Sequence, residues 1–431
     1  MQEKQNTALV WFRNDLRVTD NQSLFDATTK HDRVIGLVLI PDFWLKETHL
    51  GFKKMEGFRA RFLIETIEDL TKALKALNIH LIVKVDDGSV LKKLCNQYQI
   101  TDLYMQKEWT KEEVDHEKNI PDSVRVHKSY NQFLFHPDDL PFAIDHLPEI
   151  FTVFRKACEK NSKVRPCTPE PRKLAPENFR APSTQPLTLE TLGYESYEVH
   201  PNSAFPFQGG SRSADDRMRY YFWNTKHLSS YKKTRNGLLG TDYSSKFSPW
   251  LANGSISPKS IFWSIKDYER EIDKNQSTYW LIFELIWRDY FKYVSLRHGN
   301  SIFAVGGIKN RSYDWKHHHQ LFHQWINGTT AEPFVNANMI ELKNTGFMSN
   351  RGRQNVASYF AKTLQMDWRW GAAYFESFLI DYDVHSNYGN WMYNAGVGND
   401  PRDRVFNVRL QAERYDGKGK FQSTWLQKTL F

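Results

Sequence analysis

Short runs of apolar or β-branched residues recur along the first 135 residues, with helix-like segments between them. Such runs are typical of strands that are buried on both faces of a parallel sheet. They are TALVWF at 7–12, VIGLVLI at 34–40, HLIVKV at 80–85, DLYMQ at 102–106 and VRVHKSY at 124–130. Strands that alternate with helices predict a doubly wound α/β domain over residues 1–135.

The second and third runs are separated by a segment whose apolar residues recur at helical spacing. The residues on this face are Leu63, Ile67, Leu70, Leu74 and Leu77. The helix is predicted to end near Asn78. Ser89 is the candidate N-cap of the next helix, which continues through Leu91 and Leu94.

Prolines break this pattern between residues 160 and 206. We therefore expect residues 136–208 to be an interdomain connector draped over the surface. After Gly209 and Gly210 the apolar spacing becomes helical. The segments that show it include DDRMRYYFW, SPKSIFWSIKDYEREI, YWLIFELIWRDYFKYVSL and NVASYFAKTLQ. Residues 209–431 are predicted to form an all-α domain.

Composition adds limits on the class of protein. A chain of 431 residues is long enough for two domains with a large core. The net charge of +8 suits a polyanionic partner, although a solvated basic surface is the alternative. The cysteines, Cys95, Cys158 and Cys167, fit no zinc pattern and indicate a reducing, intracellular compartment. The N-terminus has no apolar segment typical of a signal peptide, and no apolar run is long enough for a membrane span.

The first strand is not followed by the glycine-rich turn of a dinucleotide-binding fold. Arg13-Asn14-Asp15-Leu16-Arg17 stands there instead, and it is too bulky and charged for the backbone to approach a pyrophosphate. If the protein binds a flavin, we therefore expect that flavin in the helical domain.

Asp381 and the stretch YDVHSNYGNWMY that follows it place two carboxylates, an amide and an indole within a few helical turns. Asp381, Asp383, Asn387 and Trp391 suit a pocket for a planar, polar, redox-active ring. The carboxylates can accept from ring or ribose groups, and the indole can supply an electron. A polar loop that caps a helix is the alternative, because Asp and Asn favour caps and turns.

Hydroxyl groups cluster at Ser244-Ser245-Lys246-Phe247-Ser248, just before Pro249. Hydroxyls and backbone N–H groups ahead of a helix form a natural site for a diphosphate. The alternative is that these serines only cap the helix.

Two further clusters bring polar groups together on predicted helices. Glu284, Trp287 and Arg288 share one face, where they can line a cavity for a base-like substrate or form an exposed Glu–Arg pair beside a packing Trp. In the segment NRGRQ, Arg353 can pair bidentately with Asp381, or the segment is simply a solvated helix start.

Several motifs in this order and spacing resemble the photolyase/cryptochrome family of blue-light flavoproteins, over almost the whole chain. They are WFRNDLRVTDN, TRNGLLGTDYSSKFSPWLANG, FELIWRDYF, NTGFMSNRGRQ, LQMDWRWG and LIDYDVHSNYGNWMY. The resemblance implies an N-terminal α/β domain and an all-α C-terminal domain that binds FAD.

The resemblance also assigns roles to residues. The residues assigned to FAD are Tyr231, Ser244, Ser245, Lys246, Phe247, Ser248, Arg288, Arg353, Asp381, Asp383 and Asn387. Within this set, Tyr231 and the serine loop hold the diphosphate, and Asn387 faces flavin N5. Trp391, Trp368 and Trp315 match the tryptophans that carry electrons from the surface to the photoexcited flavin.

The residues that face the substrate separate the branches of the family. Glu284, Trp287 and Asn350 match positions in photolyases that act on cyclobutane dimers. Asn350 and Gln354 replace the His pair of six-four photolyases, so the acid–base catalyst of that reaction is absent. Gln354 stands where cyclobutane-dimer photolyases usually have Met, and Tyr393 where they usually have Trp. Both substitutions resemble the DASH-type cryptochromes.

The implied activity is that of a deoxyribodipyrimidine photo-lyase, a carbon–carbon lyase. Light-excited reduced FAD passes one electron to a cyclobutane pyrimidine dimer, which opens and returns the electron. The dimer must be flipped out of the stack at a cost on the order of a few kcal/mol. Because Tyr393 and Gln354 weaken the grip on a flipped dimer, we expect a preference for single-stranded or looped DNA.

Two alternatives stay open: a non-catalytic blue-light photoreceptor that binds DNA or protein, and a photolyase that repairs duplex DNA. The chain ends soon after Trp425, without the long tail of signalling cryptochromes, which favours the enzyme. UV-damaged DNA is the expected partner, no membrane is expected, and the protein is expected to act as a monomer.

Three remaining features have competing interpretations. Arg235, Arg351, Arg404 and Gln411 match positions near the DNA backbone, or they are ordinary surface residues. Glu113 matches a contact to an antenna chromophore, commonly a folate such as methenyltetrahydrofolate, or it belongs to a solvated helix. The neighbouring histidines at 317–319 and 323 point in different directions on a helix, so no metal is expected.

Overall fold

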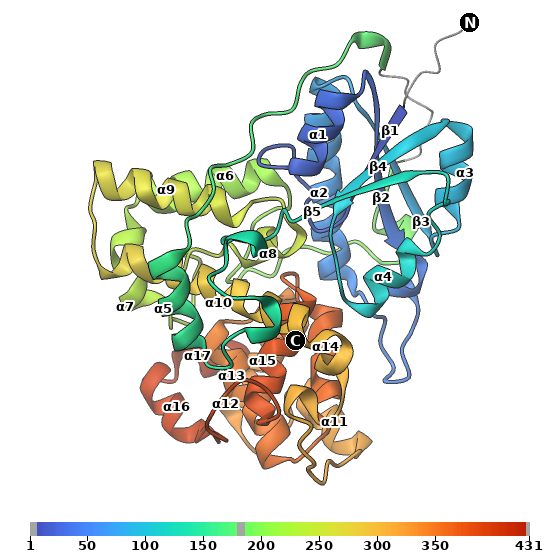
Figure 1. Ribbon diagram of the computed structural model, residues 1–431. Helices are drawn as coiled ribbons and strands as arrows, with labels where there is room; N and C mark the ends of the chain where they lie inside the picture. The colour runs from blue at the N-terminus through green and yellow to red at the C-terminus, as the bar shows by residue number, and fades with distance from the viewer. Residues whose placement is uncertain (1–6, 179–185, 428–431) are drawn as a thin grey trace, which may run out of the picture.

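Parallel strands form the core of the N-terminal part of the computed structural model, which describes residues 7–178 and 186–427. The sheet has the order β3-β2-β1-β4-β5, and every neighbouring pair is parallel (Figure 1). The strands are β1 Thr7–Phe12, β2 Arg33–Pro41, β3 His80–Asp86, β4 Ile100–Gln106 and β5 Arg125–Ser129. They coincide closely with the apolar runs, so the predicted doubly wound α/β fold is confirmed.

Helices cover both faces of this sheet. Helices α1 (Gln22–Lys30) and α2 (Gly57–Ala76) pack on one face through Leu24 and Leu70, and α3 (Val90–Gln97) packs on the other through Leu91. Apolar side chains alternate between the two faces of β1, which explains why the whole strand is buried. The helix predicted from the leucine and isoleucine spacing is α2.

Ser89 occupies the N-cap position of α3 as predicted, but the side-chain capping bond expected there is absent. The carboxylate of Asp86 accepts from the backbone N–H groups of Gly88 and Val90 at 2.8 and 2.9 Å. A carboxylate at the end of β3 therefore satisfies the first N–H group of α3, that of Val90.

Helices make up the rest of the described chain. They are α4 Lys111–Glu117, α5 Phe151–Asn161, α6 Ser211–Arg219, α7 Tyr231–Thr234, α8 Ser248–Asn253, α9 Pro258–Glu271, α10 Gln276–His298, α11 His319–Ile326, α12 Pro333–Thr345, α13 Asn350–Ser358, α14 Trp368–Phe378, α15 Val384–Ala395, α16 Val408–Tyr415 and α17 Lys420–Leu426. After residue 209, the described residues pair as strands only at an isolated bridge between Lys316 and Met366. The all-α prediction for this part is confirmed.

Helix α10 lies in the middle of the helical part, with α5, α7, α9 and α15 packed around it (Figure 1). A capping box at Asn275 and Thr278 fixes its start, since each side chain bonds the backbone of the other residue. Most of the helix is buried, including Asp289 and Lys292. It therefore presents fixed side chains to the cavity described below.

Among its described residues, the predicted connector contains one α-helix, α5, together with short 3₁₀ helices and loops. Phe154 of α5 packs against Tyr290 and Tyr293 of α10, with ring centroids 5.1 and 5.7 Å apart. Figure 1 shows the following residues running along the outside toward the α/β part. There the side chain of Asn178 bonds the backbone N–H and carbonyl of Val34, so this segment is tied to β2.

The loop after β1 docks onto the helical part. The buried guanidinium of Arg17 donates to the carbonyls of Gly254, Asp20 and Asn131 at 2.8–2.9 Å. Gly254 has a φ of +75°, and a Cβ there would lie 2.0 Å from the carbonyl oxygen of Asn14. The charged loop that ruled out a dinucleotide turn therefore joins the two parts of the molecule.

The three cysteines are free thiols. Across residues 7–178 and 186–427, no helix is long and apolar enough to cross a membrane.

Candidate functional site

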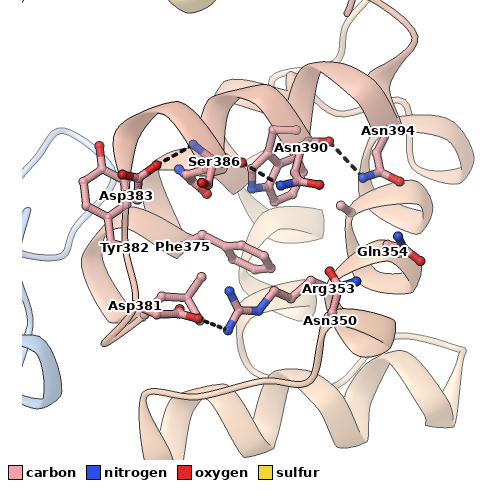
Figure 2. A pocket seen from close by; sticks show the side chains of 14 residues that line it. Asn350, Arg353, Gln354, Phe375, Asp381, Tyr382, Asp383, Ser386, Asn390 and Asn394 are labelled. Atoms are coloured by element: carbon pink, nitrogen blue, oxygen red, sulfur yellow. Dashed lines mark hydrogen bonds and ion pairs between the residues drawn. The ribbon is translucent and has the colours of Figure 1, made fainter. Parts of the chain in front are cut away.

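A cavity of about 1700 Å³, open to solvent, lies in the helical part. Its walls come from α7, the segment before and into α8, α10, α13 and α15. A second cavity of about 500 Å³ continues from it and shares Asn350, Arg353 and Asp381 with it (Figure 2).

The large cavity brings together most of the residues predicted to bind FAD or substrate. They are Tyr231, Arg235, Ser244, Ser245, Lys246, Phe247, Ser248, Glu284, Trp287, Arg288, Asn350, Arg351, Arg353, Gln354, Asp381, Asp383 and Tyr393. Asn387 and Trp391 line the smaller cavity. Arg404, Gln411, Trp368 and Trp315 line neither cavity.

The serine loop is held in shape by Arg217 of α6. This buried guanidinium donates to the carbonyls of Thr241, Ser244 and Ser245 and pairs with Asp242 at 2.8 Å. The residue before α8 is Phe247, and no side chain in the loop caps that helix. The alternative that these serines serve as the helix cap is therefore not observed, and the hydroxyls stay available to a ligand.

Lys246 is the buried cation of this loop. Its Nζ lies 3.2 Å from the centre of the Tyr243 ring and has no hydrogen-bond partner in the part of the chain that the structure describes. Burial lowers its pKa well below the usual value. A diphosphate in the cavity would supply the missing acceptor and favour the charged ammonium.

The buried Asp381 and the partly buried Arg353 form an ion pair with one contact. Arg353 Nη2 donates to Asp381 Oδ2 at 2.8 Å, and Figure 2 shows the two side chains pointing toward one another. The prediction that Arg353 binds Asp381 through two hydrogen bonds is wrong, because Arg353 Nε donates to the carbonyl of Met348 instead. Asp381 Oδ1 is buried without a partner among the described residues, so it can accept from a ligand N–H or O–H.

Asp383 is held ionised at the start of α15. Its Oδ1 accepts from the N–H of Ser386, and its Oδ2 pairs with Lys292 at 2.6 Å. Burial opposes ionisation, but Lys292, His385 and Arg288 outweigh it and lower the pKa of Asp383. One turn along, the amide of Asn387 donates to the carbonyl of Ala372 at 3.0 Å, which fixes its orientation.

The shared face of α10 is confirmed, but the Glu284–Arg288 pair is not found. Glu284 pairs with Arg235 at 2.7 Å. Arg288 donates to the carbonyls of Gln132 and Leu251. Burial raises the pKa of Glu284, and the cation of Arg235 only partly offsets this effect.

Aromatic rings form a corner at the substrate side of the cavity. Trp287 stacks on Phe151 of α5 with centroids 3.5 Å apart, and Tyr393 meets Trp287 edge to face at 6.2 Å. Phe151 does not line the cavity, so it supports Trp287 from behind. The corner presents an indole and a phenol to a ligand.

Two of the four residues predicted at the DNA backbone lie at the large cavity. Arg351 donates to Gln354 and Asn236 and lies 4.5 Å from the centre of the Tyr415 ring. Arg235 makes the ion pair with Glu284. Arg404 pairs with Asp400 at 3.0 Å, and it lies outside the cavity wall, as Gln411 does.

The three tryptophans lead from the buried cavity wall toward the surface. Trp391 is 2% exposed and Trp368 is fully buried, whereas Trp315 is partly exposed. Lys316, next to Trp315, bonds Gln365 and Asp367, which places Trp315 beside the start of α14, where Trp368 lies. Trp391 and Trp368 are therefore both buried, and Trp315, the outermost tryptophan of the predicted path, is the one nearest to solvent.

Glu113 lies at a separate cavity of about 860 Å³ between the α/β and helical parts. The same cavity is lined by Arg13, Trp44, Arg59 and His116. The carboxylate of Glu113 accepts from Thr110 at 2.5 Å. The cavity therefore brings Glu113 together with cationic and aromatic side chains.

The neighbouring histidines serve local contacts. His317 bonds Asp367 at 3.1 Å, and the side chain of His318 caps α11. No group of three or more potential metal ligands occurs among residues 7–178 and 186–427.

Sequence reasoning missed Lys292 and Arg217. Glu284, Arg288 and Lys292 are spaced by four residues, so the helical repeat would have extended the polar row on this side of the helix to Lys292, which pairs with Asp383. Arg217 has no comparable signal, because its partners lie 24–28 positions further along the chain.

The residues present fit FAD. The serine loop offers hydroxyls and a buried ammonium to the diphosphate, Asp381 Oδ1 offers a free acceptor, and Trp391 adjoins the inner cavity as a potential electron donor.

Comparisons with known proteins agree with this site. Residues 8–175 match the family model described as DNA photolyase, and residues 280–429 match the FAD binding domain of DNA photolyase. The chain therefore belongs to the photolyase/cryptochrome family. Within that family, it is 45% identical over 427 residues to a protein of Gloeobacter violaceus named Cryptochrome DASH, covering 97% of this chain and 85% of the relative.

Solved structures support the same assignment. A cryptochrome of Synechocystis sp. matches with a TM-score of 0.94 at 42% identity and covers 99% of this chain and 89% of that chain. A bacterial class III photolyase of Agrobacterium tumefaciens matches with a TM-score of 0.81 at 25% identity, covering 99% and 87%.

Proposed function

We propose that this protein uses FAD and blue light to split cyclobutane pyrimidine dimers, preferentially in single-stranded or looped DNA. The observation that supports this most is the open cavity of about 1700 Å³, because one wall carries the candidate cofactor residues and another carries the candidate substrate residues. A cofactor and a flipped pyrimidine dimer could therefore lie in contact inside it.

FAD, when bound, supplies the electron that the reaction needs. Ser244, Ser245, Ser248 and Lys246 would hold its diphosphate, with the loop kept in shape by Arg217. The Arg353–Asp381 pair and Asn387 would orient the flavin ring. Their own hydrogen bonds fix each side chain, so little reorganisation is required on binding.

The aromatic corner and the polar groups beside it would receive the dimer. Trp287, backed by Phe151, offers a face for stacking, and Tyr393 closes the corner. Glu284 can donate to a base carbonyl in its protonated form, and Asn350 can do so at any pH. Arg235 and Arg351 add positive charge for the phosphates.

The preference for single strands follows from the weakness of this grip. Tyr393 offers less stacking surface than an indole would. Gln354 is polar, and its amide oxygen already accepts from Arg351 at 2.8 Å. Single-stranded DNA avoids most of the unpairing energy, which is on the order of a few kcal/mol in a duplex.

The remaining roles extend this proposal. Trp391, Trp368 and Trp315 would carry electrons inward and restore the reduced cofactor. A folate such as methenyltetrahydrofolate would occupy the cavity at Glu113 and act as an antenna. Arg404 and Gln411 would contact the DNA backbone outside the cavity. The protein would act as a monomer in a reducing compartment, consistent with its free thiols.

A blue-light receptor is the second candidate function. Gln354 and Tyr393 favour it, because both reduce the contact with a dimer. In that case light would change the redox state of the flavin, but damaged DNA would bind without being restored.

The test uses purified protein and a single-stranded oligonucleotide with one cyclobutane dimer. The absorption spectrum should show bound flavin, and blue light should restore the undamaged bases while darkness should not. Bound flavin without any repair would favour the receptor. A protein that neither contains FAD nor takes it up on reconstitution would contradict both functions.

A further inference from the structure

Trp315, the outermost tryptophan of the proposed path, has a tyrosine and a carboxylate beside it. The rings of Tyr313 and Trp315 have centroids 5.1 Å apart at an angle of 47°. The hydroxyl of Tyr313 donates to Asp403 Oδ2 at 3.1 Å. Neither Tyr313 nor Asp403 lines the cofactor cavity, so the function proposed above gives them no role.

The indole N–H of Trp315 cannot easily release its proton. Trp315 Nε1 is buried and has no hydrogen-bond partner within residues 7–178 and 186–427. When Trp315 loses an electron, its radical cation therefore has no acceptor for the acidic N–H proton. The positive charge persists on the indole until a neighbouring group donates an electron.

Tyr313 is built to donate both an electron and a proton. Asp403 binds Lys362 through Oδ1 and accepts from Tyr313 through Oδ2, so it faces the phenol with a free carboxylate lone pair. Burial opposes the ionisation of Asp403, but Lys362 outweighs it and lowers the pKa. The Lys362 ammonium also lies 4.7 Å from the centre of the Tyr313 ring, which disfavours positive charge on that ring.

The backbone fixes this arrangement. A Cβ on Gly396 would lie 2.3 Å from Asp403 Oδ1, 2.7 Å from Lys362 Nζ and 2.9 Å from the Tyr313 hydroxyl. The carboxylate, the ammonium and the hydroxyl therefore all lie next to Gly396. Arg311 donates to the carbonyl of Gly396 at 2.9 Å.

We propose that Tyr313 is the terminal electron donor of the tryptophan path, with Asp403 as its proton acceptor. This inference rests on the proposed function, because the oxidant is the Trp315 radical cation left after light-driven electron transfer to the flavin. One electron moves from Tyr313 to that radical cation and restores the neutral indole. The phenolic O–H bond breaks, and the proton forms a new O–H bond on Asp403 Oδ2. The products are a neutral tyrosyl radical and a neutral carboxylic acid.

A second tyrosine provides a matched control. Tyr388 lies 6.1 Å from Trp368, and its hydroxyl is 3.5 Å from Glu376 Oε2. Its hydrogen bond is longer than that of Tyr313, and it adjoins the middle tryptophan rather than the outer one. Radical formation at Tyr388 would be the competing outcome.

The experiment follows radicals after a blue flash in the FAD-loaded protein, by transient absorption and electron paramagnetic resonance. The intact protein and Tyr388→Phe should show a neutral tyrosyl radical. Tyr313→Phe should lose it and keep a long-lived tryptophan radical. Asp403→Asn should slow the formation of the tyrosyl radical at least tenfold. Equal FAD absorbance per protein in all variants serves to show that the site is folded.

The outcomes separate the two proposals. A tyrosyl radical that persists in Tyr313→Phe, or disappears in Tyr388→Phe, would overturn the inference. A tryptophan radical without any tyrosyl radical in the intact protein would overturn the inference and leave the tryptophan path standing. The absence of both radicals would contradict the path itself.

Discussion

At the scale of single residues, the pKa values of two acidic side chains in the cavity are shifted in opposite directions. The pKa of Asp383 is lowered by Lys292, whereas burial raises that of Glu284. One side chain is a fixed anion, and the other remains a neutral donor to a higher pH than an ordinary glutamate. Asp383 therefore suits a cationic partner, and protonated Glu284 suits a partner with a carbonyl oxygen.

Binding of dimer-containing DNA should depend on the protonation of Glu284. As the pH rises through its raised pKa, the carboxyl group ionises and can no longer donate to a base carbonyl. We expect binding to weaken as the pH rises. Glu284→Gln should remove that pH dependence, because an amide donates in the whole range. Fluorescence anisotropy with a damaged oligonucleotide measures the binding constant at each pH. If Glu284→Gln keeps the same pH dependence as the unmodified protein, Glu284 is not the donor to the base carbonyl.

Lys246→Met should weaken FAD binding about tenfold, or ~1.4 kcal/mol. The substitution keeps the length of the side chain and removes the ammonium that has no partner in the described part of the protein. The flavin dissociation constant, measured by fluorescence, should be unchanged in the control Lys72→Met on the exposed side of α2. Equal affinity in Lys246→Met and the unmodified protein would remove Lys246 from the diphosphate site.

At the scale of elements, helices α14 and α15 cross so closely that Gly371 leaves no room for a side chain. A Cβ there would lie 2.2 Å from Cη2 of Trp391. The indole proposed as the first electron donor is thus positioned by backbone contact. Phe375, which lies in α14 like Gly371, packs against the Trp391 ring with centroids 5.1 Å apart.

Gly371→Ala should displace Trp391, destabilise the protein by about 1–3 kcal/mol and slow photoreduction of the flavin. Chemical denaturation and the rise of reduced flavin under blue light measure the two effects. Gly57→Ala is the control, since the nearest atoms to its new Cβ would be 3.8 Å away. Normal photoreduction in Gly371→Ala would mean that Trp391 is not the first donor.

The local spacing of apolar residues was sufficient to predict many helices and strands. Predictions of individual side-chain contacts failed where the partner came from another element. The spacing of Leu70 and Leu74 predicts α2, because a buried helical face needs only a local repeat. Ser89 has the predicted N-cap position without the expected side-chain bond, and Asp86, at the end of a strand, accepts from the first N–H group of the helix instead. The geometry of Arg353 was missed because the carbonyl of Met348 competes for its Nε.

At the scale of the whole molecule, the site depends on contacts between distant parts of the chain. Phe151, within the predicted connector, supports Trp287, and Arg217 shapes the loop before α8. Neither contact has a periodic signal in the sequence. The family motifs located the cavity residues, but the partners that hold them could be seen only in the folded chain.

The net charge of +8 should contribute to DNA binding mainly where it meets the cavity. Arg351→Ala should reduce the slope of the logarithm of the binding constant against the logarithm of salt concentration by about one. Lys93→Ala, on the exposed side of α3, should leave the slope unchanged. If both variants keep the slope of the unmodified protein, Arg351 does not contact a phosphate.

The central claim is tested most directly by comparing repair of the same cyclobutane dimer in a single strand and in a duplex, in blue light and in darkness, with the FAD of the protein reduced. We predict repair only in light, at a higher initial rate in the single strand. Equal light-driven rates on both substrates would contradict the strand preference, and no repair of either substrate would contradict the proposed activity.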